Sequence, residues 1–307
     1  MSDSRPYALD SEEEPRRLDR QAELAGLEDH LSRIPMKPDS KVLDAGCGSG
    51  SMTRLMAKRT ARGHVTGVDL NGKYLDYARE VAQEEGIGNI SFDTGDIFDL
   101  PFDDDSFDIV WSKYVLQWVN EPAKAVKEFK RVTRPGGHVV CCNFDNLLVY
   151  NYPVDEALQS DIESVISGLI DPYVGRKMYS MFLGEGMLDI TVDIEADRIF
   201  TVIGKIDEER RRNMADQYTA TLPQMTKIVG SQQKAESYIQ RHLAYLDRED
   251  TISPCIPRVE FPRVGKSFCV EIADEFSERV QGLADRDSLG QDAGMLFFMG
   301  EARIPGF

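Results

Sequence analysis

Hydrophobic residues in the first half of the chain alternate between short extended runs and helical stripes. Runs rich in Val, Ile and Leu, typical of buried strands, occupy 41–46, 64–69, 90–96, 107–113 and 138–144. Apolar residues at helical spacing stand between them, at 51–60, 72–85 and 122–132. Apolar strands separated by helices predict a parallel sheet that is covered on both faces and has right-handed crossovers.

The segment before this alternation predicts one helix over residues 11–33. Ser11 is placed to cap it, and apolar residues recur at helical spacing, at Leu18, Leu24, Leu27 and Leu31. Pro35 and Pro38 end the pattern. We therefore expect residues 1–40 to form a helical cap.

The regular alternation of strand and helix patterns ends after residue 145. Residues 146–172 predict a lid insertion over the open end of the sheet, and a helix follows at 173–184. Alternation over 188–204 predicts an antiparallel hairpin at the sheet edge. Two helices are then expected, at 207–221 and 227–247. The main domain thus extends over the lid and this helical pair.

Prolines mark a linker at 251–266, which separates the main domain, 41–250, from a tail at 267–307. The tail predicts a short α+β segment made of a strand, a helix and an apolar strand. Its pattern, with VEIAD, ERVQGL, RDSL and GMLF in order, resembles the first part of a small bacterial domain of unknown function. We expect the tail to pack on the main domain or on a dimer mate.

Composition narrows the class of partner. A net charge of −17 disfavours nucleic acid and anionic membranes, because a polyanion is repelled by both. The 5 cysteines form no C-x-x-C pair, and the 4 histidines are dispersed, so neither a disulfide framework nor a metal site is indicated. The chain shows no apolar signal core and no run of the roughly 20 apolar residues that a membrane span needs. These features predict a cytoplasmic protein.

Candidate chemistry begins at the first strand, in KVLDAGCGSGSMTRL (41–55). An apolar strand breaks into glycine at every second position, Gly46, Gly48 and Gly50, and then restarts as a helix. Glycine allows positive φ and a close approach of the backbone to a ligand, while the helix directs free N–H groups at the same place. This stretch predicts a binding site for a small ligand.

Aspartates close three successive strands, at Asp44, Asp69 and Asp96. The ligand crevice of an open α/β sheet lies beyond the carboxyl ends of its strands. An acidic residue closing the second strand, about 20 residues after the glycines, is the ribose-hydroxyl partner in nucleoside sites. The spacing predicts that Asp69 binds a ribose and that Asp96 lies near an adenine amino group.

These motifs resemble the class I S-adenosylmethionine-dependent methyltransferases, in particular the ubiquinone/menaquinone methyltransferase subgroup. The matching segments, which lie within residues 11–205, are VLDAGCGSG, VTGVDL, TGDIFDLPFDDDSFDIVWSKYVLQWV and RVTRPGGHVV. With the resemblance, the predicted fold is a Rossmann-like, seven-stranded, mostly parallel sheet with an antiparallel last strand. The implied cofactor is S-adenosylmethionine, with S-adenosylhomocysteine as product.

The resemblance implies cofactor-binding roles for residues at the ends of the first four strands: Asp44, Gly46, Gly48, Asp69, Leu70, Asp96, Ile97 and Lys113. Asp44 and the two glycines would hold the methionine end, and Asp69 the ribose hydroxyls. Leu70 would pack on the adenine, whose edge Asp96 and the Ile97 backbone would bind. The Lys113 carbonyl would meet the amino group, unless Lys113 is simply a solvated strand-end residue. Gln21 is a weaker candidate for the methionine carboxylate.

The predicted function is methyl transfer from S-adenosylmethionine to O, N or C of a small organic acceptor, quinone-like or a secondary metabolite. The acceptor should lie near Tyr114, Gln117, Trp118 and Phe144, beneath a lid formed by 146–182 and the segment around Tyr7. No residue stands out as a general base. A non-catalytic S-adenosylmethionine-binding module is the alternative, while an NAD oxidoreductase would need the GxGxxG spacing that is missing. The sequence is compatible with a homodimer.

Overall fold

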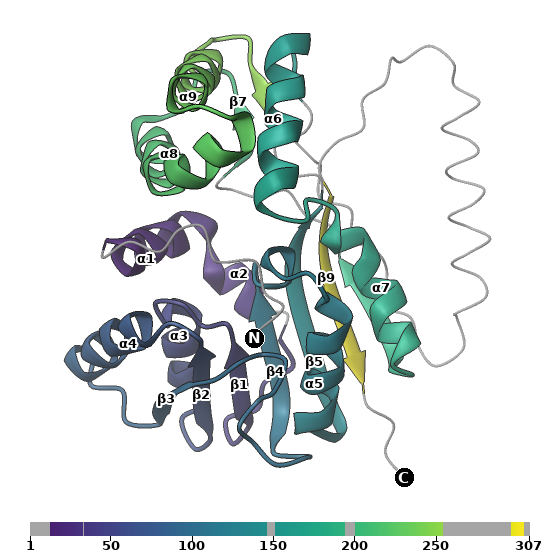
Figure 1. Ribbon diagram of the computed structural model, residues 1–307. Helices are drawn as coiled ribbons and strands as arrows, with labels where there is room; N and C mark the ends of the chain where they lie inside the picture. Colours follow the sequence, from purple (N-terminus) through teal and green to yellow (C-terminus); the bar gives the residue numbers. More distant parts are fainter. Residues whose placement is uncertain (1–12, 33, 146–150, 194–199, 254–295, 304–307) are drawn as a thin grey trace.

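The computed structural model describes residues 13–32, 34–145, 151–193, 200–253 and 296–303. Its centre is a run of five parallel strands in the order β3-β2-β1-β4-β5 (Figure 1). Their bounds are β1 Lys41–Ala45, β2 His64–Asp69, β3 Ile90–Thr94, β4 Phe107–Lys113 and β5 Thr133–Asp145. The predicted α/β class and its five parallel strands are confirmed.

Two more strands continue the sheet beyond β5. The tail strand β9, Leu296–Arg303, runs antiparallel to β5 over His138–Asp145, and β6, Leu188–Asp193, pairs with the far edge of β9. The predicted hairpin over 188–204 is therefore wrong. The long β5 presents an open edge whose N–H and C=O groups need partners, and β9 supplies them over His138–Asp145.

A separate pair is formed by β7, Val202–Ile203, and β8, Ile252–Ser253. The expected linker at 251–266 thus begins as a strand pairing rather than as free chain. The expected strand and helix at the start of the tail lie outside the described residues, whereas the expected apolar strand falls within β9.

Helices cover both faces of the sheet, as the strand pattern requires. One face carries α2 Leu27–Leu31, α3 Ser51–Arg59 and α4 Gly72–Glu84, and the other carries α5 Pro122–Val132 and α7 Val174–Gly184 (Figure 1). Successive strand residues face opposite sides. Val42 and Ile109 accordingly join the cluster of α2 and α3, while Leu43 and Val110 join that of α5 and α7.

The N-terminal cap is two helices rather than the predicted single one. α1 spans Glu14–Ala25 and ends at Gly26, whose φ of 65° is left-handed, after which α2 starts in a new direction. A left-handed glycine ends a helix at little steric cost. Ser11 and Tyr7 lie outside the described residues.

A helical layer lies beyond the carboxyl ends of the parallel strands. It consists of α6 Glu156–Leu169, α8 Glu208–Val229 and α9 Gln232–Leu246 (Figure 1). α8 continues through Pro223, where the sequence indicated a break, and ends only at Gly230. The buried face of α8 includes both Tyr218 and Met225, so its packing on either side of Pro223 outweighs the lost backbone hydrogen bond.

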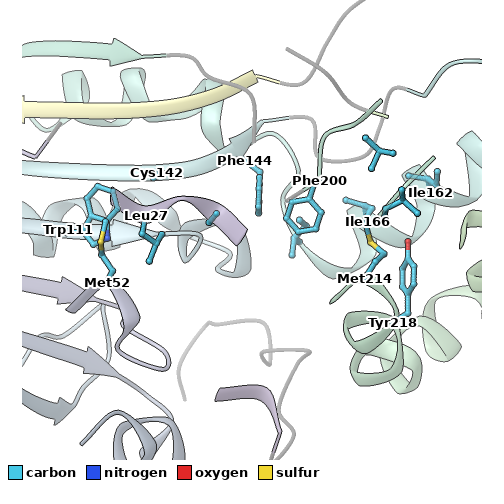
Figure 2. Close-up of a cluster of buried hydrophobic side chains, with 14 of the residues drawn as sticks. Leu27, Met52, Trp111, Cys142, Phe144, Ile162, Ile166, Phe200, Met214 and Tyr218 are labelled. Atoms are coloured by element: carbon cyan, nitrogen blue, oxygen red, sulfur yellow. The ribbon is translucent and has the colours of Figure 1, made fainter. Parts of the chain in front are cut away.

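One hydrophobic cluster runs without interruption from the sheet into this layer. Figure 2 shows it passing from Trp111 on β4 through Phe144 and Phe200 to Met214 and Tyr218 on α8. All five side chains are buried, with exposures of at most 6%. The sheet and the helical layer therefore share a core, and this shared core fixes the space between them.

Candidate functional site

A cavity of about 680 Å³ opens between the strand ends, α1 and the helical layer. Its wall includes all eight predicted cofactor residues, which are Asp44, Gly46, Gly48, Asp69, Leu70, Asp96, Ile97 and Lys113. Gln21 from α1 lines it as well. The sequence prediction thus named residues that the fold brings to one place, although they span nearly a hundred positions.

The glycine loop between β1 and α3 forms the floor of the cavity. Gly46, Gly48 and Gly50 have φ values of 79°, 54° and 74°, which disfavour any residue with a Cβ. A Cβ on Gly46 would also lie 2.3 Å from Val115 Cγ2, inside van der Waals contact. The loop therefore needs glycine for both backbone conformation and space, which leaves its amides close to whatever the cavity holds.

Asp44 is a buried carboxyl group at the end of β1. Thr53 Oγ1 on α3 donates a hydrogen bond of 2.5 Å to its Oδ2. Loss of hydration on burial raises the pKa of Asp44 from 3.8 to about 7, and the Thr53 hydrogen bond opposes that rise. A carboxyl group with this pKa is easily ionised by a cation, so the position suits a positively charged part of a ligand.

Asp69 is oriented by two backbone amides. Gly48 N–H donates to Oδ2 at 3.0 Å, and Asn71 N–H donates to Oδ1 at 2.9 Å. Burial raises the pKa of Asp69, while these amides act against the increase. Each carboxylate oxygen retains a lone pair, so the fixed carboxylate can accept hydrogen bonds from two neighbouring hydroxyl groups.

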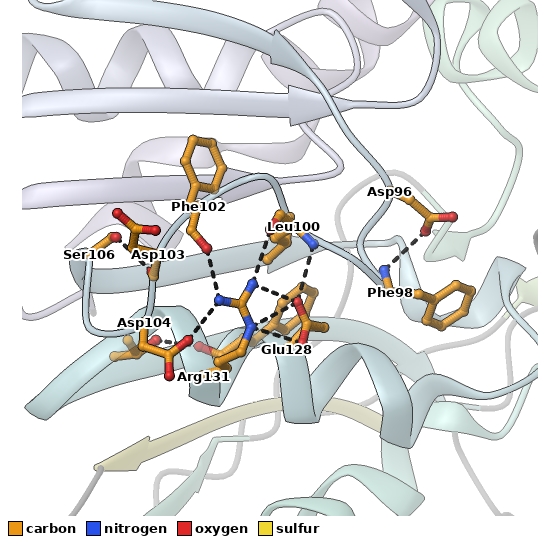
Figure 3. Close-up of polar contacts among 11 residues, drawn as sticks. Asp96, Phe98, Leu100, Phe102, Asp103, Asp104, Ser106, Glu128 and Arg131 are labelled. Carbon is orange, nitrogen blue, oxygen red and sulfur yellow. Dashed lines mark hydrogen bonds and ion pairs between the residues drawn. The ribbon is translucent and has the colours of Figure 1, made fainter.

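The loop after β3 is held by Arg131 of α5 (Figure 3). Its guanidinium donates to the carbonyl oxygens of Leu100 and Phe102, at 3.0 and 2.8 Å, and binds the carboxylates of Glu128 and Asp104. Asp104 belongs to a run of three aspartates at 103–105, so Arg131 also holds this acidic turn. Arg131 thereby fixes the loop that carries Asp96 to the cavity.

Asp96 itself begins this loop. Its Oδ1 accepts a hydrogen bond of 3.0 Å from Phe98 N–H, as Figure 3 shows. This local turn leaves the other carboxylate oxygen for a ligand and places the neighbouring Ile97 in the cavity wall. Phe98 lines the cavity too, which the sequence analysis did not predict.

The cap helix α1 is tied down across the cavity by Asp19. Its carboxylate accepts hydrogen bonds from the Ser51 hydroxyl, from Arg54 Nη2 at 3.0 Å and from Tyr77 Oη at 2.9 Å. α1 is thus anchored to both α3 and α4, and it brings Gln21 to the cavity wall.

Arg17 is a cavity residue that the sequence analysis missed. Its guanidinium is buried, forms a two-point ion pair with Glu14 at 2.7 and 2.6 Å, and donates to Gln21 Oε1 at 2.5 Å. It also reaches Asn213 of α8 at 3.3 Å. Since Asn213 lies 196 positions from Arg17 in the sequence, no local pattern could have signalled this arrangement.

The end of the cavity away from the aspartates is a chamber of apolar side chains. We call it the aromatic chamber and define it by residues from β4–β5, α6 and α8: Tyr114, Trp118, Phe144, Ile166, Phe200, Met214 and Tyr218. The Tyr114 ring stacks on Phe144 with centroids 4.0 Å apart, and Phe200 meets Phe144 edge-on at 5.3 Å. Lys113 lies at the boundary, with its ammonium 4.5 Å from the Tyr114 ring centroid.

The roof of this chamber differs from the predicted lid. α6 contributes, as expected from 146–172, but α7 packs against β5, β9 and α5 and supplies no cavity residue. α8 takes its place, although the sequence analysis gave that helix no role in the site. Tyr114, Gln117, Trp118 and Phe144 all line the cavity where the acceptor was expected.

Among the described residues, no cluster of three or more His, Cys, Asp or Glu is arranged to bind a metal ion. Nor does any helix in those ranges combine the length and apolar character that crossing a membrane requires.

Two family models match this chain, one over the part that contains the parallel strands and one over the tail. A family model described as a methyltransferase domain matches residues 36–186. The ubiquinone/menaquinone biosynthesis C-methyltransferase UbiE of Bdellovibrio bacteriovorus is 32% identical over 164 residues, which cover 50% of this chain and 68% of that protein. The chain belongs to the class I S-adenosylmethionine-dependent methyltransferase family. The methyl donor of this family is S-adenosylmethionine.

A second relative of this chain is an uncharacterized methyltransferase, C1B3.06c, of Schizosaccharomyces pombe. It is 38% identical over 153 residues, which cover 47% of this chain and 55% of the relative. The chain thus spans about half the length of the first curated relatives that it matches. Its tail, residues 259–307, matches a different family model, described as uncharacterized, in line with the resemblance noted above.

Solved structures support the fold described above. Phosphoethanolamine N-methyltransferase 2 of Haemonchus contortus superposes with a TM-score of 0.55 at 17% identity, covering 98% of this chain and 60% of that one. At this identity the likeness concerns the fold alone.

Proposed function

We propose that this protein transfers a methyl group from S-adenosylmethionine to an uncharged, ring-bearing small molecule in the aromatic chamber. The observation that carries the proposal is the division of the cavity. The charged residues of its wall are Arg17 on α1 and, at the strand ends, Asp44, Asp69, Asp96 and Lys113. The residues that define the aromatic chamber carry no formal charge.

The cavity wall fits the proposed cofactor on three separate grounds. The volume of about 680 Å³ can contain a nucleoside and a second small molecule. The glycine loop leaves room for a ligand against its backbone. Asp69 presents an oriented carboxylate for vicinal hydroxyl groups, and Leu70, which is 54% exposed beside it, offers an apolar surface for a base.

The charges fit the methionine end. Asp44 and Arg17, the latter ion-paired with Glu14, are an anionic and a cationic group in the wall of the same cavity, which suits an amino group and a carboxylate. S-adenosylmethionine supplies a methyl carbon on a sulfonium, and in-line displacement transfers that carbon to an electron pair of the acceptor. The sulfur keeps the electrons of the broken bond, and an O–H, N–H or C–H acceptor releases one proton.

The protein's contribution to such a reaction is positioning and exclusion of water. Orientation of two bound reactants supplies about 7–11 kcal/mol of barrier reduction. The Tyr114–Phe144 stack and Phe200 form a wall against which a flat ring can lie in van der Waals contact. The relative named for ubiquinone/menaquinone C-methylation agrees with a ring-shaped acceptor.

The proposal is tested by calorimetric titration with S-adenosylhomocysteine, followed by isotope transfer from methyl-labelled S-adenosylmethionine to a panel of hydroquinones and phenols. We expect the wild type to bind S-adenosylhomocysteine and Asp69→Ala to bind it at least tenfold more weakly. We also expect the wild type to give labelled product with a ring acceptor. The exposed Asp93→Ala is the matched control. Absence of binding overturns the proposal, and binding without transfer to any acceptor favours a non-catalytic module.

A further inference from the structure

One polar side chain in the cavity wall, beside the aromatic chamber, has a buried oxygen that the packing does not explain. Gln117 lies in the cavity wall within the 3₁₀ helix η1, Leu116–Trp118, and is only 2% exposed. Its Oε1 is buried and has no hydrogen-bond partner among the described residues. A buried amide oxygen without a donor is destabilising, because its hydration is lost and nothing replaces it.

The backbone holds Gln117 in this position firmly. Its carbonyl oxygen accepts a hydrogen bond of 2.8 Å from Asp171 N–H, just after α6 ends. Three residues before it, Tyr114 adopts a φ of 58° and stacks on Phe144. Gln117 therefore sits at the junction of the sheet and the roof helix, beside the aromatic wall.

An unpartnered amide beside a cavity can be satisfied by what the cavity binds. Rotation of the terminal amide presents Oε1 to a ligand without moving the backbone, and an amide oxygen accepts a hydrogen bond only from an O–H or N–H group. The chamber residues themselves carry no formal charge. The complementary ligand group is thus a neutral donor on an otherwise apolar molecule.

We infer that Gln117 hydrogen-bonds a hydroxyl group on the ring of the methyl acceptor and so determines which rings are bound. This inference rests on the proposed function and narrows its acceptor to hydroxylated rings, such as phenols and hydroquinones. Gln117 is a specificity-determining and positioning residue in this account, and the cofactor side of the cavity does not depend on it.

The test compares two rings that differ by one hydroxyl group, 2-naphthol and naphthalene. Their binding is measured by equilibrium dialysis against the full chain saturated with S-adenosylhomocysteine. We expect the wild type to bind 2-naphthol about tenfold or more tightly than naphthalene, since a buried hydrogen-bonding group discriminates against a ligand that leaves it unpaired. Gln117→Met should remove this preference while leaving naphthalene binding unchanged, and Gln117→Glu, which keeps an acceptor oxygen, should restore part of it.

Gln224 provides a matched control. It lies on α8, its Oε1 is also buried without a partner, and it is outside the cavity wall. Gln224→Met should therefore keep the full preference for 2-naphthol.

Each other outcome overturns the inference. A preference that survives in Gln117→Met, or a wild type that does not distinguish the two rings or binds neither, contradicts it. Calorimetry with S-adenosylhomocysteine on the same samples separates this failure from failure of the proposed function. If the nucleoside binds normally and ring discrimination is absent, only the role of Gln117 is wrong.

Discussion

Replacement of Asp44 by Asn should stabilise the unliganded protein and at the same time weaken cofactor binding. Asp44 is buried, and its pKa rises from 3.8 to about 7 on folding. A carboxyl group whose pKa is raised in the folded state stabilises that state below its unfolded pKa, and this contribution is lost as the pH increases through the folded pKa. At neutral and alkaline pH the buried charge therefore lowers stability.

The size of the effect follows from the two pKa values. The rise of the Asp44 pKa from 3.8 to about 7 lowers the free energy of unfolding by about 4 kcal/mol at pH 8 and by about 2 kcal/mol at pH 5. Asn avoids this cost but accepts a weaker hydrogen bond from Thr53 than a carboxylate does. We expect a net gain of about 1–3 kcal/mol in the free energy of unfolding at pH 8, with a smaller gain at pH 5.

Urea unfolding at both pH values measures the gain, and titration with S-adenosylmethionine measures the loss of affinity, expected to be at least tenfold. The exposed strand residue Asp93, changed to Asn, is the control and should alter neither quantity. An Asp44→Asn protein that is less stable than the wild type at pH 8, or whose stability difference does not shrink at pH 5, would refute the reasoning.

Three other perturbations test the framework around the cavity. Gly46→Ala should abolish S-adenosylhomocysteine binding and lower the free energy of unfolding by about 1–3 kcal/mol, because the new Cβ would lie 2.3 Å from Val115 on a left-handed backbone. Normal binding by calorimetry would contradict this. Arg131→Ala should speed amide hydrogen exchange across the loop 96–106 and weaken nucleoside binding several-fold, since two loop carbonyls lose their donor; unchanged exchange would contradict it. Deletion of 254–307 should lower the urea midpoint sharply, because it removes the strand that covers one edge of β5 and leaves β6 unpaired. An unchanged midpoint would show that β9 is dispensable.

The half of the site that could be predicted from sequence is the half built from local patterns. Asp44, Asp69 and Asp96 each follow a recognisable strand, and parallel strands bring their carboxyl ends together automatically. The positive φ of Gly46 likewise follows from the residue type at a strand–helix turn.

The other half depends on contacts between distant segments. The approach of Asn213 to Arg17 joins residues 196 positions apart, and neither has a pattern that points to the other. Met214 and Tyr218 look like ordinary core residues of an amphipathic helix, and only the packing of α8 over the strand ends turns them into a chamber wall. The pairing of β9 with β5 is likewise determined by tertiary contacts, because the pairing of edge strands has no local sequence signal.

The most direct test of the central claim is a crystal structure of the protein with S-adenosylhomocysteine bound. The account predicts both ribose hydroxyl groups on the Asp69 carboxylate, the adenine against Leu70, and the sulfur facing the aromatic chamber at Tyr114 and Phe144. A nucleoside bound elsewhere, or a sulfur directed away from the chamber, would contradict it.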